Sequence, residues 1–252
     1  MLQEPFVYGT SPIHDIDPRF KIVMATLYAF AVALSNRFPA LFLSLAFSFV
    51  LVGMSRLPLL DVAKRVALVN GFVLFFWFMV PFTYPGEPLF SLGPLTATQE
   101  GVLVATRVTL KSNAILLAFI ALIATSSVAT LGAALSRLGV PQKVVHLLLL
   151  NYRYIFVMEE EYHRLVRSTV VRGFRPSTKL HTYRTFAYLV GMLFVRASGR
   201  AERVYMAMLC RGFSGKFHCL HEFSSSPRDI IWLALTATTV LGMEALEWVV
   251  YK

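Results

Sequence analysis

The sequence has few charged side chains and only two cysteines, Cys210 and Cys219, among its 252 residues. Its charged fraction is 15%, against about 25% in an ordinary soluble domain. Two cysteines without a C-x-x-C pair exclude a disulfide-rich scaffold. The chain also lacks H-E-x-x-H, G-x-S-x-G and G-x-x-x-x-G-K-[ST], so zinc-protease, nucleophile-elbow and phosphate-loop chemistries have no support.

Apolar residues are abundant, and the few charges are unevenly distributed. The apolar fraction is 56%, the mean hydropathy is +0.62 and the net charge is +10. Of the 24 lysines and arginines, 15 lie between residues 137 and 228. This combination indicates a membrane protein with one concentrated basic region and excludes a soluble nucleic-acid-binding protein.

Five apolar segments are candidates for membrane spans. The residues before Phe20 do not resemble a signal peptide, because Asp15, Asp17 and Pro18 interrupt any apolar run. By the positive-inside rule, the N-terminus and the basic region are expected in the cytoplasm and the C-terminus outside. The predicted spans are residues 20–34, 38–54, 66–84, about 96–129 and 230–250, with a loop at Pro81 to Pro88.

Two long amphipathic helices are predicted between the fourth and fifth spans, at residues 142–172 and 179–211. Both have apolar residues at spacings of three and four. Those of the first are Leu148, Tyr152, Ile155, Met158, Tyr162, Leu165 and Thr169, and those of the second are Tyr183, Phe186, Val190, Leu193, Ala197, Ala201, Val204 and Met208.

Both helices end on the same three residues, Arg-Gly-Phe, at Arg172 and at Arg211. An alignment that pairs these arginines also pairs Arg164 with Arg203, which indicates an internal repeat. A glycine in this position ordinarily closes a helix, and an arginine there complements the negative helix end. Two matching ends favour a second role, in which two guanidinium groups dock into two acidic grooves of a partner.

Two further clusters have mainly structural explanations. His218, Cys219 and His221, with His14 as a fourth ligand, could hold a metal, but their spacing matches no specific zinc pattern. A loop without a metal is the favoured interpretation. The acidic run 159–161 is expected to pair with Arg153, His163 and Arg164, with Glu160 and Arg164 in the favourable i,i+4 order.

These features resemble the transmembrane T component of energy-coupling-factor (ECF) transporters. The resemblance rests on the two Arg-Gly pairs, on Asp-Pro-Arg-Phe-Lys at residues 17–21, and on the stretch from Arg153 to Glu161, and it covers nearly the whole chain. Residues 173–184 and 200–205 are most similar to the cobalt/nickel group, the CbiQ type.

The resemblance implies an all-α polytopic membrane protein with about five transmembrane helices and two long crossing cytoplasmic coupling helices. The expected organisation is an N-terminal transmembrane part at 1–135, a coupling-helix region at 136–228 and a last transmembrane helix at 229–252. The protein is expected in the inner (cytoplasmic) membrane, and ATP hydrolysis is expected on its partners. The implied role is the coupling subunit of an importer for cobalt or nickel.

The implied partners are two ATP-binding-cassette (ABC) ATPase subunits and a membrane-embedded metal-capture subunit, with or without a small accessory membrane subunit. No cofactor, catalytic residue or nucleic-acid partner is implied. The site residues carried over fall into two groups. The ATPase-docking group is Val171, Arg172, Gly173, Cys210, Arg211 and Gly212, and the group facing the capture subunit is Leu148, Tyr152, Ile155, Tyr183, Phe186, Val190 and Leu193.

Two alternatives remain open at the level of sequence. Basic amphipathic helices commonly bind anionic lipid, so the chain could be an integral membrane scaffold or channel. An intramembrane enzyme is a weaker alternative, since no nucleophile or metal constellation supports it.

Overall fold

The computed structural model describes residues 6, 9, 11–92, 95–215 and 226–249. The expected all-α architecture is confirmed, with one short antiparallel hairpin in addition. The described residues form two compact units, one from residue 6 to 131 together with 226–249, and the other from 132 to 215. The elements of the first unit are α1 (Pro18–Leu34), α2 (Phe38–Ser55), α3 (Leu59–Thr83), β1 (Pro88–Leu92), β2 (Leu95–Thr98), α4 (Gln99–Leu122) and α8 (Pro227–Val249).

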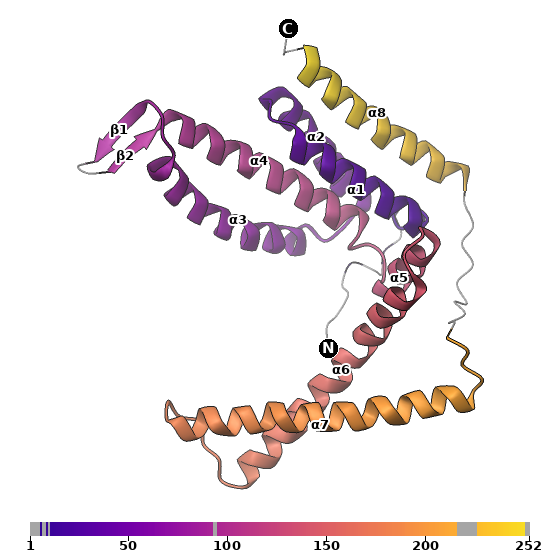
Figure 1. Cartoon of the computed structure of the whole chain (residues 1–252). Coiled ribbons are helices and arrows are strands. Elements are labelled where there is room, and N and C mark those ends of the chain that lie inside the picture. Colours follow the sequence, from indigo (N-terminus) through magenta and orange to yellow (C-terminus); the bar gives the residue numbers. More distant parts are fainter. Residues whose placement is uncertain (1–5, 7–8, 10, 93–94, 216–225, 250–252) are drawn as a thin grey trace. The chain divides into compact units, whose positions relative to one another are not determined.

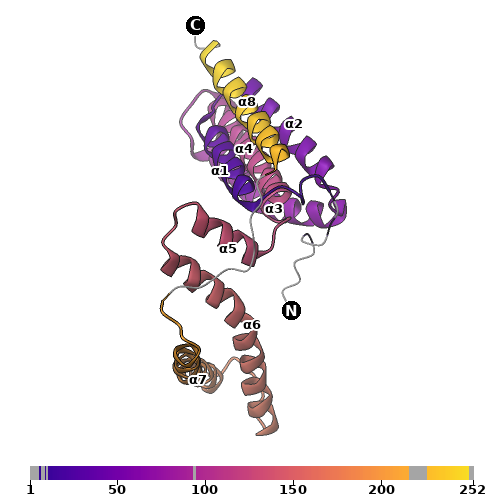
Figure 2. The same cartoon turned by 90° about the vertical axis from the view of Figure 1, so that its right-hand side faces the viewer.

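The first unit is a helical bundle in which α4 packs against α1, α2 and α3 (Figures 1 and 2). Helix α8, from the other end of the chain, packs on α1 and α2. The core of this bundle consists of buried apolar side chains that include Tyr28, Leu41 and Leu122. A network of hydroxyl groups ties α1, α2 and α4 together: Tyr28 donates to the Ser44 carbonyl at 2.6 Å, and the Ser48 hydroxyl donates to the Ala114 carbonyl at 2.7 Å.

Four helices of this unit, α2, α3, α4 and α8, are long and apolar enough to cross a membrane. Helix α1, which contains the predicted first span, has 17 residues. An α-helix needs about 20 residues to cross a bilayer, so α1 requires local thinning or lies partly at the membrane surface. The bundle is therefore that of a polytopic membrane protein.

The structure corrects three predicted boundaries. Helix α3 begins at Leu59 and not at residue 66, and it continues through Pro81, which was expected in a loop. The fourth span was predicted from 96 to 129, but residue 96 lies in β2 and α4 ends at Leu122. At the end of α4 the Ile123 and Ala124 amides both donate to the Phe119 carbonyl, at 2.8 Å and 3.2 Å, so the regular helical bonding is not continued. The Thr125 hydroxyl donates to the carbonyls of Ala121 and Leu122, each at 3.1 Å.

A separate helix, α5 (Val128–Arg137), follows the end of α4. The Ser127 hydroxyl accepts a hydrogen bond from the Thr130 amide at 3.2 Å and so caps this helix. The hydroxyl-rich sequence from Thr125 to Ser127 thus lies between the two helices and starts the second, which the apolar run alone did not indicate.

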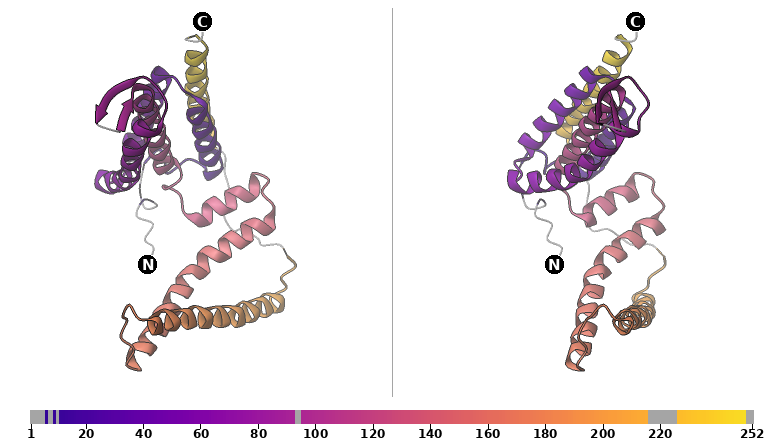
Figure 3. Two further views of the ribbon diagram at one scale, coloured as in Figure 1. Left: turned by 60° about the vertical axis from the view of Figure 1, so that its left-hand side comes forward. Right: turned by 90° about the vertical axis from the view of Figure 1, so that its left-hand side faces the viewer.

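The second unit contains two long helices, α6 (Gln142–Val171) and α7 (Leu180–Cys210). Figures 1 and 3 show that these two helices cross. Their predicted lengths were close to those observed, because Pro141 precedes the first and each ends at its glycine. The predicted division of the chain at residues 135 and 228, and the cytoplasmic position of this unit, stay predictions.

Candidate functional site

The ends of α6 and α7 have the same backbone geometry. After α6, Arg172 is the last residue near helical conformation, and Gly173 has φ +83°. The Gly173 amide donates to the Val170 carbonyl at 2.9 Å, and the Phe174 amide donates to the Thr169 carbonyl at 3.1 Å. This pair of bonds is the Schellman motif, a helix end closed by a left-handed residue.

The end of α7 repeats each of these bonds. Gly212 has φ +77°, and its amide donates to the Leu209 carbonyl at 2.9 Å. The Phe213 amide donates to the Met208 carbonyl at 3.1 Å. Arg172 and Arg211 therefore occupy equivalent positions on two equivalent helix ends, as the sequence repeat indicated.

The two glycines are required for conformation and not for space. A Cβ atom added at Gly173 or at Gly212 would meet nothing within 4 Å, but a side chain would be strained at these positive φ angles. The surroundings of both glycines are open, and Val171, Arg172, Cys210 and Arg211 are all exposed. Each helix end thus presents a guanidinium group beside bare backbone that another protein can approach closely.

The phenylalanine that follows the first glycine packs on the second helix. The Phe174 ring lies 6.0 Å from the Phe186 ring and 6.3 Å from the His181 ring, measured between centroids, and both partners belong to α7. The Ser177 amide donates to the Thr182 hydroxyl at 3.1 Å and fixes the start of α7. The end of α6 is therefore held in place by α7.

A cluster of one acid and three arginines joins the two helices where they cross. Glu161 of α6 is only 6% exposed and accepts a short hydrogen bond from Arg196 of α7. Its carboxylate also lies 3.9 Å from Arg200 of α7 and 3.8 Å from Arg164 of α6. The hydrogen bond from Arg196, with the positive charges of Arg196, Arg164 and Arg200, lowers the pKa of the Glu161 carboxyl group, although burial opposes the effect.

Of the acidic pairs expected within α6, those with Arg164 are confirmed, whereas residues 159–161 form no ion pair with Arg153 or His163 in the described part of the chain. Glu160 pairs with Arg164 at 3.7 Å, as its spacing predicted. The partners of Glu161 on α7 were missed, although a sequence feature pointed to them. In the alignment of the two helix ends, Glu161 is paired with Arg200, so an acid and a base occupy equivalent positions.

Because of this equivalence, the two arginine ends lie at equal distances along their helices from the ion-pair cluster. Arg172 lies eleven residues after Glu161, and Arg211 lies eleven residues after Arg200. At about 1.5 Å of rise per residue, each arginine lies roughly 16 Å along its helix from the ion-pair cluster. The angle between the helices at this cluster therefore sets the separation of the two arginines.

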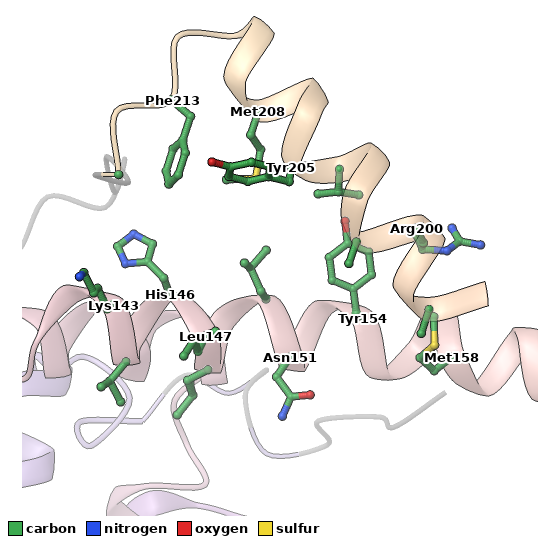
Figure 4. A pocket seen from close by; sticks show the side chains of 17 residues that line it. Lys143, His146, Leu147, Asn151, Tyr154, Met158, Arg200, Tyr205, Met208 and Phe213 are labelled. Atoms are coloured by element: carbon green, nitrogen blue, oxygen red, sulfur yellow. The ribbon is translucent and has the colours of Figure 1, made fainter. Parts of the chain in front are cut away.

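A groove of about 1110 Å³ opens between the first half of α6 and the second half of α7. Figure 4 shows His146 and Tyr154 rising from α6 on one side, with Tyr205, Met208 and Phe213 descending from the other. Most of the lining is apolar. Helix pairs that are complete in themselves fill such a space with side chains.

The seven residues predicted to face the capture subunit are mostly uncovered. Leu148, Ile155, Tyr183, Phe186 and Val190 are exposed, whereas Tyr152 and Leu193 are partly buried. Leu148 also lines the groove, and Phe186 contacts Phe174. The structure thus places the predicted residues on both helices of the pair.

No group of three or more His, Cys, Asp or Glu side chains that could hold a metal ion occurs within the described ranges. His14, considered above as a ligand, bonds the Ser11 hydroxyl at 2.6 Å and the Phe6 carbonyl at 2.9 Å. His218, Cys219 and His221 lie outside the described residues.

A polytopic helical bundle in one chain with a crossed pair of amphipathic helices that end alike defines a helical membrane protein of a distinct class. The sequence matches the family model described as cobalt transport protein, CbiQ, over residues 9–219, and the chain belongs to this family. It is a T component of the ECF transporter type.

Curated relatives agree with this assignment over most of the chain. The chain is similar to the energy-coupling factor transporter transmembrane protein EcfT of Bacillus subtilis, with 24% identity over 98% of this chain and 95% of the relative. It is 28% identical to EcfT of Brevibacillus brevis, over 83% of each protein. An uncharacterized protein of Methanocaldococcus jannaschii is 27% identical over 91% of this chain and 82% of its own length.

Proposed function

We propose that this chain is the transmembrane coupling subunit of an ECF-type importer for cobalt or nickel ions. In this role it transmits the motion of two ABC ATPases to a membrane subunit that captures the metal. ATP hydrolysis belongs to the ATPases, and this chain carries the movement. The observation that supports the proposal most directly is the pair of equivalent, exposed arginine ends on α6 and α7.

The mechanism follows from the geometry of the crossed pair. Each ATPase takes one arginine end into an acidic groove, where a guanidinium group can form bidentate hydrogen bonds with a carboxylate. When ATP binding brings the ATPases together, the two arginines move with them. Because α6 and α7 are joined at Glu161, this movement changes the angle between the helices.

The apolar residues of the pair provide the second contact. Tyr183 and Val190 are 65% and 50% exposed on a helix that also carries several arginines. An apolar surface of this kind ordinarily marks an interaction site. We assign it to the metal-capture subunit, which the changing helix angle would tilt in the membrane. The metal is then the cargo of that subunit.

The test is co-purification of tagged full-length chain with the ATPases encoded in the same genome, and with Arg172→Glu/Arg211→Glu in parallel. The wild type is expected to retain both ATPases and the double variant neither. Arg167→Glu/Arg203→Glu is the matched control, since it makes the same charge change at exposed positions of the same two helices. Full assembly and uptake by the Arg172/Arg211 variant would exclude the docking role.

The lipid-binding alternative has its own expected outcome. A scaffold or channel would purify alone, would recruit no ATPase and would bind vesicles of anionic lipid through the basic helices. Such a chain would also respond equally to the double variant and to its matched control, because lipid binding depends on total charge and not on two capped helix ends.

A further inference from the structure

We propose that Lys21 is a positioning residue that fastens both chain connections between the bundle and the α6–α7 pair to the start of α1. Its consequence for transport rests on the function proposed above. The chain leaves the bundle after α4 and returns to it at the start of α8. Thr125 and Ser126 lie on the outgoing connection, and Ser226 and Asp229 lie where α8 begins.

The outgoing connection is held by the ammonium group of Lys21. This side chain is 1% exposed. Its Nζ donates to the Ser126 hydroxyl at 2.9 Å, the Thr125 hydroxyl at 3.4 Å and the His14 carbonyl at 3.4 Å. A lysine ammonium has three N–H donors, so these three acceptors satisfy it completely.

The returning connection is held by Asp229, which is 2% exposed. One carboxylate oxygen accepts from the Ser226 amide at 2.8 Å, which is the bond from N3 back to the N-cap residue in a capping box at the start of α8. The other accepts from the Asp17 amide at 3.3 Å, which ties α8 to the residue that caps α1. The Asp17 carboxylate is in turn paired with Arg19 at 2.8 Å.

The contacts of Lys21 and those of Asp229 involve the same group of charged side chains. Asp15, Asp17 and Asp229 all attract the Lys21 ammonium group. Lys21 thus bonds the outgoing connection directly and balances the carboxylate that holds the returning one. The bonds and charges join residues that are far apart in sequence, since Lys21 reaches Ser126 and Asp17 reaches Asp229.

Burying a charged side chain such as Lys21 costs desolvation free energy, and an apolar side chain of similar volume is often at least as stabilising. What the Lys21 ammonium group adds is a defined geometry, because its three hydrogen bonds have fixed partners. Here that geometry fixes both connections to the same helix start. Motion that reaches the bundle through either connection therefore acts on one anchored position, the start of α1.

The residues 17–21, Asp-Pro-Arg-Phe-Lys, acquire a function from this arrangement. Pro18 and the Asp17 cap start α1, Arg19 orients the Asp17 carboxylate, and Lys21 lies one turn further on. The segment that precedes the first span in sequence is the structural base on which both connections rest.

The first measurement is hydrogen exchange of the full-length chain, without partners, for peptides spanning 122–128 and 226–232. Lys21→Gln is expected to accelerate exchange in both segments by about tenfold or more, the scale of losing hydrogen bonds to a charged group. Ser126→Ala, which removes one acceptor, is expected to accelerate the first segment only. Lys64→Gln is the matched control, as Lys64 is exposed on α3 and pairs with Asp61 of the same helix at 3.4 Å.

The second measurement uses the complete complex in proteoliposomes, with cobalt(II) as the transported ion. In Lys21→Gln, ATPase retention and ATP hydrolysis are expected to stay within about twofold of the wild type while uptake per ATP falls about tenfold, a change equivalent to about 1.4 kcal/mol of coupling. An equal fall in hydrolysis and uptake would mean a merely structural role and would overturn the proposal.

The outcomes separate this proposal from the proposed function. Exchange that rises in neither segment, or in only one, overturns the anchoring role whatever the complex transports. A wild-type complex that carries no cobalt overturns the proposed function and leaves the exchange result intact. Should Lys21→Gln not fold, Ser126→Ala decides: unchanged exchange at 122–128 and unchanged uptake per ATP would refute the anchor.

Discussion

The bundle and the crossed helix pair differ in how far they complete their own packing. Helix α4 of the bundle buries eight of its 24 residues. Helix α6 buries only Val145, Glu161 and Leu165 of its 30 residues, and α7 buries only Thr182 and Leu189 of its 31. The bundle has a core of its own, whereas the pair is joined mainly by one ion-pair cluster and the packing of Phe174.

The difference in buried residues shows what each region requires from its surroundings. The exposed apolar side chains of α2, α3 and α8 lie on helices that qualify as membrane spans, so lipid can cover them. Those of α6 and α7 alternate with arginines, as in a surface that other proteins cover. The bundle needs a membrane, and the pair needs partners.

The largest expected contrast comes from one leucine in each region. Leu41→Ala removes a side chain that is 0% exposed in the bundle and is expected to lower the free energy of unfolding by about 2–4 kcal/mol. Leu180→Ala removes one that is 76% exposed in α7 and should change it by less than about 0.5 kcal/mol. Unfolding in mixed micelles by added SDS would measure both, and equal effects would contradict the contrast.

The two helix ends give the next effect. Gly173→Ala and Gly212→Ala each force a side chain into the left-handed region, at an expected cost of about 1–2 kcal/mol. Gly191→Ala is the matched control: this glycine lies inside α7 with nothing within 4 Å of an added Cβ, so alanine should stabilise the helix by about 0.5–1 kcal/mol. Helicity and thermal unfolding of the purified chain would show these opposite signs.

The ion-pair cluster should determine how well the two helix ends are positioned. Glu161→Gln removes the charge that joins α6 to α7, so the distance between the ends is expected to become more variable. Spin labels on Cys210 and on Val171→Cys, in a chain with Cys219→Ser, would report the distribution by pulsed electron resonance.

Glu160→Gln is the matched control for this experiment, because Glu160 is exposed and its ion pair is with Arg164 of its own helix. It should leave the distribution unchanged. A distribution equally narrow in Glu161→Gln would show that the crossing does not depend on the cluster.

The smallest expected effect is that of pH on the same cluster. The pKa of the Glu161 carboxyl group is lowered in the folded protein from its ordinary value of 4.5. Its contribution to the pairing of α6 and α7 is therefore complete above about pH 4.5 and is lost as the pH falls through the lowered pKa. The spin-label distances should be constant from neutral pH down to about 5 and should broaden in stronger acid.

Much of this molecule could be predicted from local patterns. The apolar runs predicted most boundaries of the bundle helices to within a few residues. The spacing of Leu148, Tyr152 and Ile155 predicted α6. The repeated Arg-Gly-Phe gave both helix ends, because the left-handed closing residue is a local requirement that glycine meets. The assignment to a family rests on these same features.

Other features depend on contacts between distant residues and were therefore missed. The extension of α3 before residue 66, the hairpin of β1 and β2 and the end of α4 at Leu122 were not predicted. Periodicity does not reveal which hydroxyl group will take a helix carbonyl. The bond from Glu161 to Arg196 was also missed, since spacing along one helix says nothing about the helix that crosses it.

The sequence by itself determined that the chain is a helical membrane protein and that two of its helices end alike, because composition, periodicity and helix closure depend on neighbouring residues. Only the tertiary structure decided where α6 and α7 cross and that Lys21 and Asp229 bring both connections to the start of α1. Those contacts join residues far apart in sequence, and their geometry exists only once the helices have packed.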